Sequence, residues 1–112
     1  MPTHAELAGK LLGDAATFFR TLAEQNDSLA EQMTENATVF DQMVNLITQD
    51  PNGELEGTSN AELTSRLLKD AAGFFRTLAE QNEPIREQMN ENAAVYEQIG
   101  DLVADDPLGI LD

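Results

Sequence analysis

The stretch FFRTLAEQN spans Phe18–Asn26, and the same letters return at Phe74–Asn82. Around it, residues 5–56 align with residues 61–112 without a gap, and more than half of the aligned positions are identical. A repeat of this length is usually one supersecondary unit that cannot bury its apolar face alone, and two copies are too few for a solenoid. The repeat therefore predicts two units that pack on one another.

Each copy contains two segments with the apolar periodicity of a helix. In the first segment, apolar residues from Leu7 to Leu22 fill one half of a helical wheel, while Gly9 falls on the polar half. The motifs THAE and SNAE predict a capping box at its start, with Thr3 or Ser59 as the N-cap. The second segment has a wider apolar stripe, which favours contact with two neighbours: Leu29, Met33, Ala37, Phe40, Met43, Val44 and Ile47 in the first copy, and Ile85, Met89, Ala93, Tyr96, Ile99 and Val103 in the second.

Short turns join the two helices within each copy. Asn26 or Asn82 ends the first helix, because asparagine is common at helix ends. In the first copy, Ser28 with Glu31 offers a second capping box. In the second copy, Pro84 suits a first helical turn, where its missing N–H costs nothing.

The linker between the copies is residues 50–58, DPNGELEGT, whose proline, glycines and asparagine indicate a loop. Residues 1–112 are expected to form a single helical domain, with one hairpin at residues 5–56 and the other at residues 61–112. The predicted fold class is all-α, an antiparallel four-helix bundle built from two duplicated helical hairpins. An open pair of hairpins completed by dimerisation is the alternative.

The chain of 112 residues is strongly acidic, with six Lys and Arg against 21 Asp and Glu and a net charge of −15. Such a field repels phosphate backbones and anionic membranes, so we expect no direct nucleic acid and no membrane as a partner. The expected partner is a protein of basic or mixed charge, or a second copy in a homodimer. The acids are spread over both copies, which indicates solvated helix faces, and a salt-rich host is a further explanation. Because no secretory signal or long apolar run is present, the expected location is cytoplasmic.

The motifs of enzymes and metal sites are missing. His4 is the only histidine, no Glu-x-x-His or Gly-x-Ser-x-Gly motif occurs, and DPNGELEG has the spacing of neither a phosphate-binding loop nor a calcium loop. The absence of cysteine excludes disulfides, thiolate metal ligands and thiol nucleophiles. The sequence therefore predicts no catalytic residue, no metal, no cofactor and no enzymatic activity.

Polar residues near the end of the repeated stretch are the first candidate site, because a duplicated core does not explain them. As a structural feature, Arg20 would pair with Glu24, or with Glu31 or Glu35. As a functional feature, the repeated polar residues would form a doubled surface for a partner. This candidate partner surface comprises Arg20, Glu24 and Asn26 with their copies Arg76, Glu80 and Asn82.

Two further features depart from a plain bundle. Asn36 and Asn92 recur inside the apolar stripe, where a buried polar residue sets helix register or supplies a polar contact inside a ligand cavity. The chain ends in DPLGILD where the first copy has DPNGELE, so Leu108, Ile110 and Leu111 form a candidate docking tail. This tail is expected to fold back over the end of the bundle, or to contact a partner or a second copy.

The composition and the motifs lead to three functional hypotheses. The leading one is a non-enzymatic, acidic helical module for protein interaction or regulation. The second is a nucleic-acid mimic that occupies the site of a DNA-binding protein, which the charge supports and the even spread of acids does not. The third is a carrier of a small ligand, with a pocket between the hairpins near the phenylalanine pairs and near Asn36 and Asn92.

Overall fold

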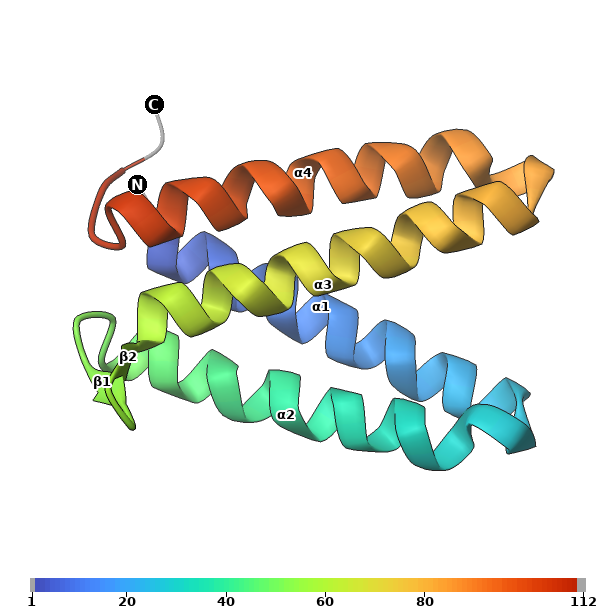
Figure 1. The fold of residues 1–112 in the computed structure, drawn as a ribbon, viewed down its shortest axis with the longest axis horizontal. Coiled ribbons are helices and arrows are strands. Elements are labelled where there is room, and N and C mark those ends of the chain that lie inside the picture. The colour runs from blue at the N-terminus through green and yellow to red at the C-terminus, as the bar shows by residue number, and fades with distance from the viewer. Residues whose placement is uncertain (1, 111–112) are drawn as a thin grey trace.

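The computed structural model describes residues 2–110, which form four long helices with short elements between them (Figure 1). The helices pair as two hairpins, α1 with α2 and α3 with α4, so the chain is the all-α, antiparallel four-helix bundle that the periodicity predicts. In chain order the elements are α1 (His4–Gln25), the 3-10 turn η1 (Asp27–Leu29), α2 (Ala30–Gln49), β1 (Glu54–Leu55), β2 (Thr58–Ser59), α3 (Asn60–Gln81), the 3-10 turn η2 (Glu83–Ile85) and α4 (Arg86–Asp105).

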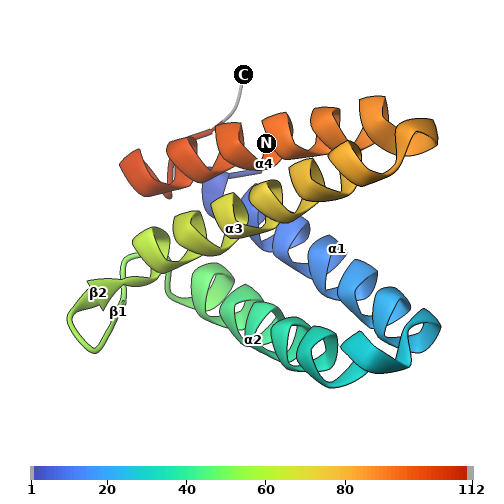
Figure 2. The same cartoon turned by 45° about the vertical axis from the view of Figure 1, so that its right-hand side comes forward.

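The two hairpins cross one another. In Figure 1, α1 passes behind α3, and in Figure 2 the hairpins α1–α2 and α3–α4 diverge like the arms of a V. Helix α1 contacts both α3 and α4, and α2 contacts α3, so α1 and α3 lie at the centre of the molecule. Both hairpin turns lie at one end of the bundle, and the linker, the start of α1 and the end of α4 lie at the other.

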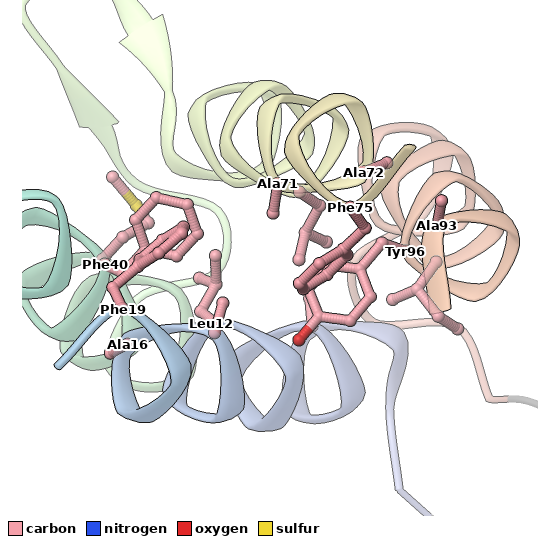
Figure 3. Close-up of a cluster of buried hydrophobic side chains, with 14 of the residues drawn as sticks. Leu12, Ala16, Phe19, Phe40, Ala71, Ala72, Phe75, Ala93 and Tyr96 are labelled. Atoms are coloured by element: carbon pink, nitrogen blue, oxygen red, sulfur yellow. The ribbon is translucent and has the colours of Figure 1, made fainter. Parts of the chain in front are cut away.

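Small side chains are buried on both central helices, α1 and α3. Ala16 on α1 and Ala71 on α3 are almost fully buried, and Figure 3 shows Leu12 and Ala71 between two groups of aromatic rings. Burying a leucine side chain stabilises a fold by about 2 kcal/mol, so the burial of Leu12 contributes to holding the core together. The largest fully buried aliphatic side chains in residues 2–110 are Leu12, Ile47, Leu68 and Val103.

Each first helix begins at the residue that the capping motifs predict. The Thr3 hydroxyl accepts from the N–H of Glu6 at 3.1 Å, and the Thr3 N–H donates to the Glu6 carboxylate at 2.8 Å, which completes a capping box. At the start of α3, the Ser59 hydroxyl accepts from the N–H of Glu62 at 3.0 Å. These bonds satisfy N–H groups that have no partner inside the helix.

The start of each second helix differs from the prediction. The prediction of a capping box at Ser28 and Glu31 is wrong. The chain forms η1 there, and α2 begins after Leu29 without a side-chain cap. Leu29 and Ile85 were expected in the buried stripes, but they are 39% and 38% exposed. Both residues belong to the 3-10 turns, which point them away from the position that a continuous helix would impose.

The linker contains a two-stranded hairpin where the composition indicated a loop. Strands β1 and β2 pair antiparallel, and Glu56 and Gly57 between them both have positive φ, at 53° and 86°. Positive φ at both central residues is the requirement of the tight turn that best matches the twist of a hairpin, and glycine adopts it without strain.

The linker and the C-terminal segment hold the two first helices in the same way. After α2, the Gly53 carbonyl accepts from the backbone N–H of Asn60 at 2.8 Å. After α4, the Gly109 carbonyl accepts from the backbone N–H of His4 at 2.8 Å, and the Asp106 carbonyl lies 2.8 Å from the His4 Nδ1 atom. The chain therefore uses the end of each hairpin to fix the start of the other hairpin.

Gly9 lies in the core, although its place on the helical wheel predicted a polar face. A Cβ atom at this position would lie 2.8 Å from the Thr48 Cγ2 atom, so α1 and α2 approach closely where α1 has no side chain. In the second hairpin the counterpart of Gly9 is the buried Ser65, and a Cβ atom at Gly100 of α4 would lie 3.5 Å from the Ser65 Oγ atom, an ordinary van der Waals distance. The wheel missed Gly9 because it ranks residues by polarity and not by size.

Candidate functional site

A continuous cluster of aromatic rings crosses the bundle from α2 to α4 and contains all five phenylalanines and the single tyrosine. Phe19 packs on Phe40 of its own hairpin, and Phe18 packs on the rings of the other hairpin, as the angle between adjacent helical residues predicts. The ring centroids along the cluster lie 5.1 Å apart for Phe40–Phe19, 5.6 Å for Phe19–Phe74, 6.3 Å for Phe74–Phe18, 5.5 Å for Phe18–Phe75 and 5.0 Å for Phe75–Tyr96.

Groove A lies between α2 and α3, at the α2 end of this cluster, and has a volume of about 320 Å³. One wall is a face of α3, because residues 67, 70 and 74 follow the spacing that places side chains on the same side of a helix. The other wall is formed in the same way by residues 36, 39 and 40 of α2. The groove is lined by Phe19, Asn36, Val39, Phe40, Leu67, Asp70 and Phe74.

Groove B lies between α4 and α1, at the other end of the cluster, and has a volume of about 290 Å³. Figure 3 shows that Phe19 and Phe40 lie on one side of the α1–α3 crossing and that Phe75 and Tyr96 lie on the other. Each residue of groove B is the repeat counterpart of a residue of groove A. The groove is lined by Phe75, Asn92, Val95, Tyr96, Leu11, Asp14 and Phe18.

The two grooves differ at one ring. In groove B, the Tyr96 hydroxyl donates to the backbone carbonyl of Leu11 at 2.8 Å, and Figure 3 shows its oxygen directed toward α1. Burial, reinforced by the negative charge of Asp14, raises the pKa of Tyr96 well above its usual range. In groove A the counterpart ring is Phe40, which has no hydroxyl to donate to the corresponding carbonyl of Leu67.

The acidic residues of the two grooves also have different neighbours. In groove B, the Asp14 carboxylate lies 3.6 Å from the Lys10 ammonium. In α3, the cation at the position of Lys10 is Arg66, but its guanidinium lies 3.6 Å from Glu62 instead. Within residues 2–110, no cationic side chain lies within 4.0 Å of the Asp70 carboxylate. Among the described residues, the Asp70 carboxylate of groove A is therefore not part of an ion pair.

Arg20 and Arg76 do not lie in the grooves but bridge the two helices of their own hairpins. The Arg20 guanidinium lies 2.7 Å from the carboxylate of Asp41, and that of Arg76 lies 2.6 Å from the carboxylate of Glu97. The hydrogen bond from Arg76 lowers the pKa of Glu97. The partners predicted for Arg20 are wrong, because the antiparallel α2 brings residue 41 level with it, and not Glu31 or Glu35.

Part of the candidate partner surface forms a shallow depression near the turn of the first hairpin, with a volume of about 310 Å³. Arg20 and Glu24 line it together with Ala30. In the second hairpin, residue 86 is arginine where the first copy has Ala30, and its Nε atom donates to the Ala79 carbonyl at 3.1 Å. The surface around Arg76 and Glu80 therefore differs from the one around Arg20 and Glu24.

The asparagines among the predicted site residues have two different settings. Asn26 and Asn82 end α1 and α3, and their side-chain amides donate to the carbonyls of Leu22 at 3.3 Å and Leu78 at 3.1 Å. Asn36 and Asn92 are only half buried, and each lies in the wall of a groove. The structure thus separates Asn26 and Asn82 from the grooves and brings Asn36 and Asn92 into them.

The C-terminal segment lies against the start of α1, but its apolar side chains stay accessible. Ile110 forms a β-bridge with Thr3, and the Pro107 carbonyl accepts from the N–H of Ala5 at 2.9 Å. Leu108 and Ile110 are 53% and 54% exposed. Leu111, the third residue of the candidate docking tail, lies outside the described residues.

Several groove residues were not among the predicted site residues, and they include the aspartates, the valines and the half-buried leucines. Asp14 and Asp70 are identical in the repeat, as are Val39 and Val95, so the repeat itself carried a signal. The aspartates were missed because acids on a helix are usually solvated. Val39 and Val95 do not belong to the predicted buried stripes, and both are 47% exposed.

Within residues 2–110, no group of three or more His, Cys, Asp and Glu side chains could hold a metal ion. None of the helices in this described part of the chain combines the length and the apolarity needed to cross a membrane. Comparison of the chain with models of protein families, with curated proteins and with solved structures finds no match.

Proposed function

We propose that this protein is a non-enzymatic, cytoplasmic interaction module whose grooves A and B bind segments of a partner protein of basic or mixed charge. The observation that carries the proposal is that one arrangement occurs twice: an open, aromatic-floored groove with an aspartate and an asparagine in its walls. A chain with a net charge of −15 favours a cationic partner and accelerates its approach.

Apolar surface is available in each groove for an anchoring side chain of the partner. Val39 and Val95 are about half exposed, and the rings of Phe74 and Phe18 beside them are only partly buried. Covering one such side chain completely contributes about 1.5–3 kcal/mol, so an apolar anchor with a polar contact at the wall suffices for weak, reversible binding.

The placement of the grooves supports simultaneous binding of two segments. Groove A lies between α2 and α3, groove B lies between α1 and α4, and the α1–α3 crossing separates them. Two molecules of one partner, or two copies of one segment, fit this arrangement. Binding two linked segments would raise the overall affinity without any new contact.

A small-ligand carrier is the second candidate, because groove A, at about 320 Å³, reaches the lower end of the volume range of ligand pockets, and groove B, at about 290 Å³, lies just below it. A carrier usually encloses most of the surface of its ligand. Grooves A and B are open to solvent between two helices, so they suit a segment that continues beyond the groove.

Affinity capture from the source lysate at two salt concentrations tests the proposal. The paired substitution Val39→Arg and Val95→Arg places a bulky cation in both grooves, and Leu55→Arg is the matched control at an exposed leucine of the linker. We expect the wild type and the control to capture a basic or mixed-charge protein at low salt. The groove variant should not capture it. Equal capture by the groove variant and the control would contradict the proposal.

A further inference from the structure

Given the proposed function, on which this step rests, we infer that groove A is the site for a lysine or arginine side chain of the partner, and that groove B is not. The two grooves match at most positions but differ in two acceptors. In groove B each acceptor is engaged by a side chain of the protein, and within residues 2–110 no side chain engages either acceptor of groove A.

The first acceptor is a backbone carbonyl in the groove wall. In groove B, the Leu11 carbonyl already accepts the Tyr96 hydroxyl at 2.8 Å. In groove A the ring at the same place is Phe40, and within residues 2–110 no side chain donates to the Leu67 carbonyl. A carbonyl oxygen has two lone pairs, so Leu67 can accept a donor from outside in addition to its helical hydrogen bond.

The second acceptor is the carboxylate. Asp14 in groove B has Lys10 at 3.6 Å, whereas Asp70 in groove A has no such neighbour in the described part of the chain. Asp70 follows Leu67 by three residues, so its side chain shares a face of α3 with Leu67. A cation bound there would meet a carboxylate and a carbonyl together, which are the acceptors that ammonium and guanidinium groups need.

The walls of groove A also suit the apolar part of such a side chain. Leu67 and Phe74 on α3 are half buried, and Val39 on α2 is 47% exposed. Lysine and arginine bury their methylene groups along apolar surface while the charged group stays at a polar site. Groove A therefore offers both parts of the contact, and a neutral side chain of the same length would obtain only the apolar part.

Nuclear magnetic resonance can follow the grooves separately, because the side-chain amides of Asn36 and Asn92 report on one groove each. The probes are two capped peptides of otherwise uncharged sequence, one with a leucine beside a lysine and the other with norleucine in place of the lysine. We expect the lysine peptide to shift the Asn36 amide with an affinity about tenfold higher than it shows at Asn92. The norleucine peptide should not distinguish the grooves.

Three substitutions test the two acceptors. Asp70→Asn should weaken binding in groove A about tenfold, and the matched Asp14→Asn should leave groove A unchanged. Phe40→Tyr should weaken binding of the lysine peptide in groove A, because the new hydroxyl can donate a hydrogen bond to the Leu67 carbonyl. Glu62→Gln should also weaken it, because Arg66 then loses its partner and can turn to Asp70.

The outcomes separate this inference from the proposed function. If the lysine peptide binds both grooves equally, or Asp70→Asn leaves the Asn36 response unchanged, the assignment of groove A is overturned and the interaction module remains. If neither peptide shifts either amide at any concentration, both are overturned. A stronger response at Asn92 than at Asn36 overturns the assignment as well.

Discussion

The Tyr96 hydroxyl on α4 donates a 2.8 Å hydrogen bond to the backbone carbonyl of Leu11 on α1, and so connects the last helix to the first. The chain has one tyrosine and no tryptophan, so the absorbance of this phenol can be followed without interference. The bond engages the Leu11 carbonyl in the wall of groove B and also contributes to the contact between the hairpins.

Removing this hydroxyl should lower stability and change the response to alkaline pH. Tyr96→Phe is expected to lower the free energy of unfolding by about 1 kcal/mol near neutral pH. This is the usual contribution of one hydrogen bond to stability. Burial, aided by Asp14, raises the folded-state pKa of Tyr96. Its stabilising contribution is therefore complete below the unfolded pKa, which is about 10, and declines as pH rises above it, because the unfolded chain then releases the proton first.

Chemical denaturation of the wild type and Tyr96→Phe between neutral and strongly alkaline pH measures this difference. The difference in the free energy of unfolding between the wild type and Tyr96→Phe should be constant around neutral pH. It should become smaller above about pH 10. Because other groups titrate in both proteins, only the difference is diagnostic. A gap that widens with pH would show that the folded state does not disfavour the phenolate.

Alanine should have opposite effects at two glycines one turn apart on α1. At Gly13 an added Cβ atom meets nothing within 4 Å, so Gly13→Ala is expected to stabilise the protein by about 0.8 kcal/mol through helix propensity. At Gly9 the Cβ atom would lie 2.8 Å from the Thr48 Cγ2 atom. Gly9→Ala should therefore destabilise by about 1 kcal/mol despite the same gain in propensity. If Gly9→Ala and Gly13→Ala change the melting temperature equally in thermal denaturation, the close approach of α1 and α2 is contradicted.

The helices and their pairing into hairpins could be predicted, because apolar spacing and capping motifs act over a few residues. Contacts that depend on how one helix is placed against another could not. Arg20 reaches Asp41 only because of the offset between α1 and α2, and Gly9 becomes buried only because α2 passes over it. The grooves arise from the crossing of two hairpins, which no local pattern encodes.

A buried hydroxyl on α3 should be replaceable with a gain in stability. Thr64 is fully buried, and within residues 2–110 its Oγ1 atom has no hydrogen-bond partner. Thr64→Val keeps the shape and removes the unsatisfied group, so we expect a gain of about 1 kcal/mol. Thr77, whose exposed hydroxyl donates to the Gly73 carbonyl at 3.1 Å, is the matched control, and Thr77→Val should give no gain. A loss of stability in Thr64→Val would mean that the hydroxyl is satisfied in solution.

Salt should stabilise the folded protein. Within residues 2–110, five ion pairs lie within 4.0 Å, but 21 acids face only six basic residues in the whole chain, so repulsion between acids outweighs these exposed pairs. Raising KCl screens that repulsion, and the melting temperature should rise. NaCl at the same ionic strength should act alike if screening is the cause. A melting temperature that falls with salt would show that the ion pairs dominate.

Neither hairpin should be stable without the other. Leu12 is fully buried, and the rings of Phe18 and Phe19 lie 5.5 Å and 5.6 Å from the rings of Phe75 and Phe74, so the first hairpin alone would expose the centre of its core. Residues 1–57 alone are also a chain of a length that buries too little surface to fold independently. We expect no cooperative thermal transition from this fragment as a monomer.

Mixing residues 1–57 with residues 58–112 is the complementary measurement. Because the contacts between α1 and α3 need no covalent link, the two fragments should associate and regain helical circular dichroism together, with a transition that depends on concentration. A fragment 1–57 that unfolds cooperatively as a monomer would mean that its apolar stripe is satisfied within one hairpin. Grooves A and B would then have to form between two independently folded units, which the shared aromatic cluster argues against.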